Sequence, residues 1–243
     1  MSYILIIGAK SDIAKALAKK YAENGYNIYL AARNSYKLKE FATNINIRTQ
    51  REVKCLEIDI LDYNSHQEFY NSLKEKPLGI ILAVGYLGDQ GRAQVSVDET
   101  NKIVNTNYTG IVNLLNIVAI DFEKLKRGFI IGISSVAGDR GRKQNYIYGS
   151  AKGGLTVYLS GLRNRLNASK VNVVTVKPGF VATKMTKGMD FPEILTAHPD
   201  QVANDIFKAQ QGGKNIVYTK WMWRWIMLII KMIPEQIFKK MNI

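Results

Sequence analysis

Short apolar runs alternate with amphipathic stretches along most of the chain, and this alternation limits the fold more than any other feature. Each apolar run has the length of a strand and is hydrophobic without interruption, as expected when both faces of a sheet are covered. Strands are predicted at residues 3–7, 27–31, 53–58, 79–83, 128–133 and 171–176, and helices at 12–24, 35–46, 64–74, 97–122 and 146–167. Strands separated by helices imply right-handed crossovers. The sequence therefore predicts an α/β fold, a single doubly wound parallel sheet with helices on both faces.

The domain organisation follows from length and composition. A chain of 243 residues corresponds to one domain, and no repeat or linker interrupts the alternation. The composition changes only after about Asn215, where Trp, Met and Lys become frequent. We therefore predict a domain at 1–215, with a lid over the substrate at about 184–199. A basic, Trp-rich, amphipathic extension of the same domain follows at 216–243.

A ligand site is expected at the carboxyl ends of the strands, where doubly wound sheets bind dinucleotides. The first strand leads into Gly8-Ala9-Lys10-Ser11-Asp12-Ile13-Ala14 at the start of a helix. Free backbone N–H groups and the helix dipole favour a phosphate there, and Asp12 is expected to cap this helix. The second strand ends at Arg33 instead of the acid that would hold the ribose of NAD. Arg33 and Lys10 together favour the 2′-phosphate of NADP(H).

A candidate catalytic pair lies on the helix predicted at 146–167. Tyr148 and Lys152 are four residues apart, so both side chains share one helical face. A free phenol is a poor acid–base group at neutral pH, and a nearby ammonium favours the phenolate. Ser135 follows the fifth predicted strand, where a hydroxyl can hydrogen-bond a substrate oxygen that gains negative charge.

These blocks, in this order, resemble the short-chain dehydrogenase family from Tyr3 to about Thr183. The resemblance implies a Rossmann-type fold and an enzyme that moves a hydride between a nicotinamide cofactor and a carbonyl or alcohol carbon. It also implies a catalytic tetrad, Asn107, Ser135, Tyr148 and Lys152. In that tetrad Asn107 would hold a water beside Lys152, Ser135 would polarise the substrate, Tyr148 would donate the proton, and Lys152 would orient the ribose.

The resemblance extends the set of expected cofactor-binding residues beyond the glycine loop. Asp59 and Ile60 match the adenine contact, and the segment after the sixth strand matches the one that wraps the nicotinamide. Two departures stand out: Asp12 and Ala14 replace glycines, and the run from Ala83 lacks the usual asparagines. The full expected set is Gly8, Lys10, Ser11, Asp12, Ile13, Arg33, Asp59, Ile60, Ala83, Gly85, Tyr148, Lys152, Pro178, Gly179, Val181 and Thr183.

The unusual blocks, among them Ala83–Gln90 and Met185–Met189, resemble the decaprenylphosphoryl-2-keto-pentose reductases. That resemblance implies an NADPH-dependent ketoreductase acting on a keto sugar carried on polyprenyl phosphate, in the synthesis of a cell-surface glycan precursor. A flavin oxidase would be its partner, because it makes the keto sugar. Two alternatives stay open: a soluble reductase of a ketoacyl or small carbonyl substrate, and a non-catalytic protein that senses NADP(H).

The composition of the extension at 216–243 bears on whether it contacts a membrane. The uncharged run from Trp225 to Ile230 is too short to span a bilayer. Arg224 and Lys231 are seven residues apart and share a helical face, and the remaining positions are apolar or aromatic. Such a helix suits an anionic membrane surface, and it equally suits packing at a subunit interface or over the substrate cleft.

The remaining features mainly exclude functions. The net charge of +14 favours an anionic partner, but no nucleic-acid-binding pattern accompanies it. Cys55 is expected in the core, and His66 and His198 at the surface. No cluster has metal-ligand spacing, so no metal is expected. A cytoplasmic protein is predicted, peripheral on the inner face of the plasma membrane if the extension binds lipid, and the family resemblance implies a homo-oligomer.

Overall fold

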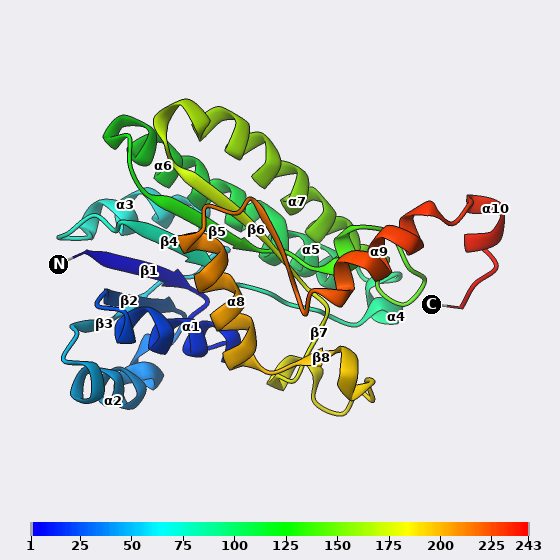
Figure 1. The fold of residues 1–243 in the computed structure, drawn as a ribbon, viewed down its shortest axis with the longest axis horizontal. Helices are drawn as coiled ribbons and strands as arrows, with labels where there is room; N and C mark the ends of the chain where they lie inside the picture. Colours follow the sequence, from blue (N-terminus) through cyan, green and yellow to red (C-terminus); the bar gives the residue numbers. More distant parts are fainter. Residues whose placement is uncertain (1, 243) are drawn as a thin grey trace.

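The computed structural model describes residues 2–242 and has a seven-stranded parallel sheet at its centre (Figure 1). The strand order is β3-β2-β1-β4-β5-β6-β9. The strands are β1 Tyr3–Ile7, β2 Asn27–Ala32, β3 Val53–Glu57, β4 Gly79–Leu82, β5 Phe129–Ile133, β6 Asn172–Pro178 and β9 Ile216–Thr219. This is the predicted doubly wound sheet. The edge strand β9 lies beyond the six predicted strands, and a small pair, β7 Phe180–Val181 and β8 Thr196–Ala197, stands apart from the sheet.

Helices cover both faces of this sheet. The α-helices are α1 Asp12–Glu23, α2 Lys39–Thr49, α3 His66–Ser72, α4 Gln90–Ala93, α5 Val97–Val104, α6 Gly110–Leu125, α7 Tyr146–Leu166, α8 Pro199–Gln211, α9 Met222–Met232 and α10 Glu235–Phe238. One apolar core packs α1, α2 and α8 against the sheet, and a second packs α3, α6 and α7 on the opposite face. Alternate residues of β1 enter the two cores, Ile4 and Ile6 in one, Leu5 and Ile7 in the other. This two-sided burial explains the continuous apolar strands.

The single helix predicted at 97–122 is wrong in one respect. A π-helical turn at Asn105–Thr109 separates α5 from α6. Such turns widen a helix locally and are frequent at functional sites. The combined segment Val97–Leu125 is also the one helix among residues 2–242 that could cross a membrane by length and composition. Half of its most apolar window is buried inside the protein, so its place in the core accounts for that composition.

Two minor predictions about single residues need correction. His66 is fully buried at the start of α3, where its ring packs edge-on against Tyr63, although the sequence placed it at the surface. Cys55 is only half-buried, because β3 is an edge strand; burial still raises the pKa of its thiol. His198 is exposed at the N-terminus of α8, as predicted.

The strand order reverses between β1 and β4, so the loops that follow these two strands diverge. In a doubly wound sheet this is the point where a ligand enters, outside the carboxyl ends of the strands. At one end of the protein α10 projects beyond the body of the fold (Figure 1). The predicted extension begins with the edge strand β9 and continues into α9 and α10.

Candidate functional site

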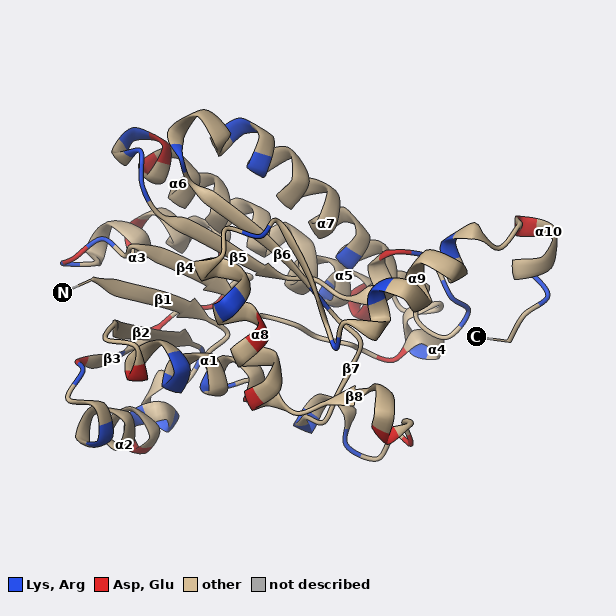
Figure 2. Ribbon diagram, in the orientation of Figure 1, with Lys and Arg blue, Asp and Glu red and all other residues tan. Residues whose placement is uncertain are grey.

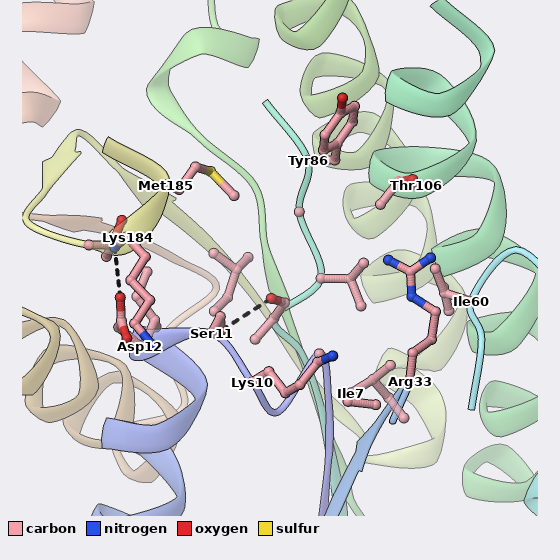
Figure 3. Close-up of a pocket in the computed structure, with 18 of the residues that line it drawn as sticks. Ile7, Lys10, Ser11, Asp12, Arg33, Ile60, Tyr86, Thr106, Lys184 and Met185 are labelled. Carbon is pink, nitrogen blue, oxygen red and sulfur yellow. Dashed lines mark hydrogen bonds between the residues drawn. The ribbon is translucent and has the colours of Figure 1, made fainter. Parts of the chain in front are cut away.

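A cavity of about 450 Å³ opens at the carboxyl ends of the strands, next to the reversal point. Its wall contains fifteen of the sixteen predicted cofactor residues: Gly8, Lys10, Ser11, Asp12, Ile13, Arg33, Asp59, Ile60, Ala83, Gly85, Tyr148, Lys152, Pro178, Val181 and Thr183. Figure 3 shows Lys10 and Arg33 at one end of this cavity and Met185 and Tyr86 toward the other. The fold thus gathers residues from β1, β2, β4, α7 and the segment after β6 around a single space.

The glycine loop is built around Gly8. This residue has a φ of +81°, which favours glycine, and a Cβ there would lie 2.8 Å from the backbone of Ala83. The first strand can therefore approach the end of β4 only with glycine at this position. Ser11 caps α1 by accepting a hydrogen bond from the Ala14 N–H (3.2 Å), so the expectation that Asp12 does so is wrong. The Asp12 carboxylate instead accepts the Lys184 N–H (2.8 Å), which ties the lid segment to α1.

The end of β2 carries the positive charge that the sequence predicted. Arg33 reaches the cavity and lies 3.8 Å from the carboxylate of Asp59, in a pair exposed enough to contribute little to stability. Glu57 could have offered a carboxylate near this site. Its oxygens are held by the N–H groups of Asn34 (2.6 Å) and Ser35 (2.7 Å), so they stabilise the turn after β2.

Tyr148 and Lys152 line the cavity from α7, on one helical face as predicted. Burial raises the pKa of the Tyr148 phenol to about 12, while its hydrogen bond with Ser135 acts in the opposite direction. Burial lowers the pKa of Lys152 to about 7. The Lys152 ammonium donates to the carbonyl of Ile133 (3.0 Å) at the end of β5 and lies 5.8 Å from the centre of the Tyr148 ring.

Small residues let α7 approach the loop that carries Ser135. A Cβ on Gly149 would lie 2.7 Å from the Ala137 carbonyl, and one on Gly138 would lie 2.6 Å from the Gly153 nitrogen. Ser135 does not line the cavity wall; its oxygen accepts the Ala137 N–H (3.1 Å). The glycines in the two sequence blocks are thus what brings the serine loop against the tyrosine helix.

The neighbouring Ser134 lines the cavity but has a different task. Its hydroxyl donates to the Lys152 carbonyl (2.9 Å) and shares a hydrogen bond with Thr156 (2.7 Å), so it holds α7 on the end of β5. This buried serine was not among the predicted site residues. Its position directly before Ser135 is the only sequence signal for it.

Asn107 is fully buried within the π-helical turn. Its amide donates to the carbonyls of Tyr86 (2.6 Å) and Ile103 (2.8 Å), and its oxygen accepts the Tyr86 N–H (3.2 Å). A Cβ on Gly85 would lie 3.6 Å from the Asn107 oxygen and 4.0 Å from the Lys152 ammonium. The structure therefore brings the Asn107 oxygen and the Lys152 ammonium close to the same side of Gly85, and the Asn107 side chain braces the backbone after β4.

The segment after β6 meets the cavity with one exception. Pro178, Val181 and Thr183 line it, whereas Gly179 does not. A Cβ on Gly179 would lie 1.9 Å from the indole nitrogen of Trp223 in α9. The structure gives Gly179 a packing role, since this glycine makes room for the tail helix, and its assignment to cofactor binding stays a prediction.

Sequence reasoning missed part of the wall: Ala32, Val84, Tyr86, Lys102, Thr106, Lys184, Met185 and Thr186 also line the cavity. Lys184, Met185 and Thr186 belong to the predicted lid, and Met185 lies over Gly85. Tyr86 lies in the run that departs from the family pattern, and its hydroxyl donates to the buried Glu99 (2.8 Å). That departure was the available signal for Tyr86.

Comparison with known proteins agrees with this fold. The chain is 35% identical over 241 residues to an uncharacterised oxidoreductase of Mycobacterium tuberculosis, covering 98% of this chain and 96% of that protein. Its fold is similar to a short-chain dehydrogenase from Sphingobium yanoikuyae in complex with NADPH (TM-score 0.84, 22% identity, 97% of both chains). It is also similar to a bulky-bulky ketone specific alcohol dehydrogenase from Comamonas testosteroni (TM-score 0.81, 20% identity, 97% of this chain and 96% of that one).

A family profile covers most of the chain. The short chain dehydrogenase profile matches residues 2–192, that is, the sheet from β1 to β6, the loops that form the cavity, and most of the lid. The full-length match to the mycobacterial protein extends the similarity through the tail. On both grounds the chain belongs to the short-chain dehydrogenase family of oxidoreductases.

Proposed function

We propose that the protein is an NADP(H)-dependent ketoreductase. One observation carries this proposal: a single cavity is lined both by Tyr148 and Lys152 and by the cations Lys10 and Arg33. An acid–base pair and phosphate-binding cations around one site suit a dinucleotide that presents its nicotinamide to a substrate carbonyl. When bound, NADPH would supply the hydride for reduction of that carbonyl carbon.

The choice of NADP(H) rests on the residues at the end of β2. A Cβ on Gly8 would meet the backbone of Ala83, so glycine at this position lets the loop that faces the cofactor phosphates lie against the end of β4. Lys10 and Arg33 face the cavity, whereas the carboxylate of Glu57 is occupied by backbone N–H groups. Arg33 would then bind the 2′-phosphate by charge-assisted hydrogen bonds.

The proton chemistry follows from the environment of Tyr148. With a pKa of about 12 the phenol is protonated at neutral pH, the form needed to donate a proton as the substrate oxygen gains charge. Ser135, hydrogen-bonded to Tyr148, would donate to the same oxygen. Lys152 would orient the ribose and favour the phenolate that remains, and Asn107 would hold the chain around Gly85 beside it.

We propose further that the substrate is a keto sugar carried on polyprenyl phosphate, with a flavin oxidase supplying the ketone. The sequence blocks that resemble the decaprenylphosphoryl-2-keto-pentose reductases support this choice. So does the tail: Trp223 of α9 donates to the carbonyl of Leu195 in the predicted lid (3.0 Å), which ties an apolar helix to that segment. The alternative is a soluble reductase of a small or ketoacyl carbonyl, as the ketone-specific structural neighbour suggests.

Consumption of NADPH by the purified protein separates these substrates. The rates would be measured with a polyprenyl-phosphate 2-keto-pentose in detergent, a ketoacyl thioester and a bulky ketone. We expect turnover on the lipid-linked sugar and little on the other two. Turnover on the thioester or the ketone alone would contradict the lipid-linked substrate and leave the ketoreductase standing, whereas binding of NADPH with no turnover on any carbonyl would favour the non-catalytic sensor.

A further inference from the structure

An unpartnered apolar surface lies on α9. Trp221, Trp225, Leu228 and Met232 recur at helical spacing, and their exposed fractions are 70%, 54%, 46% and 74%. We call these four residues the outer face of α9. Trp223 and Met227 lie on the opposite side and are buried against the protein. Single exposed apolar side chains are normal on protein surfaces, but four large ones gathered on one face indicate a binding surface.

Cations accompany this apolar face. Arg224 and Lys231 are exposed along one edge of α9, and Lys239 and Lys240 follow α10 (Figure 2). The one acid between residues 220 and 242 is Glu235, and it is paired with Arg140 at 3.0 Å. The surface therefore combines Trp and aliphatic side chains with uncompensated positive charge. That combination is typical of helices that lie in the headgroup region of an anionic membrane.

The inner side of α9 is fixed to the body of the protein. The Trp223 ring packs edge-on against Phe180 (4.9 Å between centroids) and fills the space left by Gly179. At the other end of the helix, Arg140 donates to the carbonyl of Ile233 (2.7 Å) and stacks on Phe238. These contacts hold the helix in one orientation, so the outer face cannot turn inward to bury itself.

The apolar surface continues to the lid. The Lys220 ammonium donates to the carbonyl of Ile194 (2.8 Å), and the Ile194 side chain is 69% exposed. Met185, in the same lid segment, lies over Gly85 in the cavity wall. A partner bound to the outer face of α9 would therefore lie beside the lid segment.

A second copy of this chain fits the surface less well than lipid. A two-fold interface places the same patch on both sides, so Arg224 and Lys231 would approach the same cations of the other copy. Like charges facing each other across an interface oppose association, and lysine is depleted from interface cores. Anionic headgroups instead complement every cation of this surface, while tryptophan favours the membrane–water boundary.

We propose that the outer face of α9 docks on an anionic phospholipid bilayer and holds the lid at the membrane surface. The helix has 11 residues and is too short to cross a bilayer, so it would lie in the interface. The purpose of this docking, delivery of a lipid-linked sugar, rests on the proposed function. The docking itself needs no substrate, so each can fail without the other.

Sedimentation of the purified full-length chain with vesicles tests the proposal. Phosphatidylglycerol–phosphatidylcholine vesicles should pull down the protein, phosphatidylcholine vesicles should leave it in the supernatant, and added salt should weaken the binding. Trp225→Ser with Met232→Ser, and separately Arg224→Glu with Lys231→Glu, should each lower the vesicle affinity about tenfold or more. Controls near the opposite edge of the sheet, beside β3, are Ile47→Ser, at a residue 65% exposed, and Arg48→Glu, both on α2.

Three outcomes would overturn the proposal. The wild-type protein could stay in the supernatant with anionic vesicles, or the α2 controls could lose as much binding as the α9 variants. Analytical ultracentrifugation could instead show a dimer that the α9 variants abolish, which would assign the outer face of α9 to a second copy. All surface variants should keep the far-ultraviolet circular dichroism of the wild type, since the changed side chains are exposed.

Discussion

Lys152 shows how burial, and not charge pairing alone, sets the chemistry of this site. Its side chain is 2% exposed, and its ammonium has backbone carbonyls as hydrogen-bond acceptors, Ile133 at 3.0 Å and Val84 at 3.5 Å. Without a carboxylate beside it, the charged form loses hydration, and the pKa falls to about 7. The lysine therefore changes charge near neutral pH before any ligand binds.

This lowered pKa predicts a pH dependence of stability. An unfolded lysine has a pKa of about 10.4. Between about pH 7 and pH 10 the unfolded chain therefore binds a proton that the folded chain does not, so stability rises with pH in that window. The free energy of unfolding of the wild type, minus that of Lys152→Met, should increase from about pH 7 to about pH 9.5. A difference that does not change with pH would contradict the assigned burial. This pH window ends below the pH range in which ionisation of Tyr148, whose pKa is raised, would affect the free energy of unfolding.

Arg33 carries a second prediction at this scale. Arg33→Ala should weaken NADPH binding about tenfold or more and leave NADH binding nearly unchanged, because a charge-assisted hydrogen bond to a phosphate contributes about 1.5–3 kcal/mol. Fluorescence titration with both nucleotides measures the ratio. Arg48→Ala, on the exposed side of α2, is the matched control. Equal losses of affinity for NADPH and NADH would contradict a contact between Arg33 and the 2′-phosphate.

At the scale of elements, the tail helix and the chain after β6 depend on each other. Gly179 leaves the space that Trp223 occupies, and the indole N–H of Trp223 reaches the Leu195 carbonyl in the lid. A family pattern alone assigns Gly179 to the cofactor, because the pattern does not show what packs behind the loop. The tail has no counterpart in that pattern, so only the three-dimensional structure reveals the contact.

Gly179→Ala should therefore damage the attachment of α9. The added Cβ would lie 1.9 Å from the Trp223 ring, and relief requires movement of a buried indole. Overpacking of this kind costs about 1–3 kcal/mol, which chemical denaturation would show as a lower midpoint. Gly141→Ala is the matched control, since nothing lies within 4 Å of its Cβ. Equal midpoints for the two variants would argue against the packing described.

At the scale of the whole molecule, the alternation of apolar and amphipathic runs was enough to predict the doubly wound sheet. Six strands followed from periodicity, whereas the tetrad positions came from the resemblance to the family and stay predictions. Among the elements that were not predicted, β9 is a four-residue edge strand joined to an apolar tail, and α8 has no motif attached to it. The π-helical turn around Asn107 was also beyond reach, because a widened turn leaves the apolar period almost unchanged.

The burial of His66 and the capping role of Ser11 mark the same limit. Both depend on which segment packs over a residue, and the local sequence pattern does not contain that information.

The homo-oligomer and the flavin oxidase stay predictions. Ile120 on α6 and Val157 on α7 are exposed apolar residues on the long helices. Analytical ultracentrifugation of variants substituted at these two positions would test whether the chain assembles through these helices.

In the proposed mechanism, Tyr148 protonates the carbonyl oxygen of the substrate while hydride is transferred to the carbonyl carbon. NADPH consumption by Tyr148→Phe measures this most directly, with Tyr158→Phe as the control, since Tyr158 lies on the same helix and hydrogen-bonds Asn116 outside the cavity. We predict that Tyr148→Phe lowers turnover by about two to four orders of magnitude with NADPH affinity unchanged, and that Tyr158→Phe retains it. Full turnover in Tyr148→Phe would contradict the account.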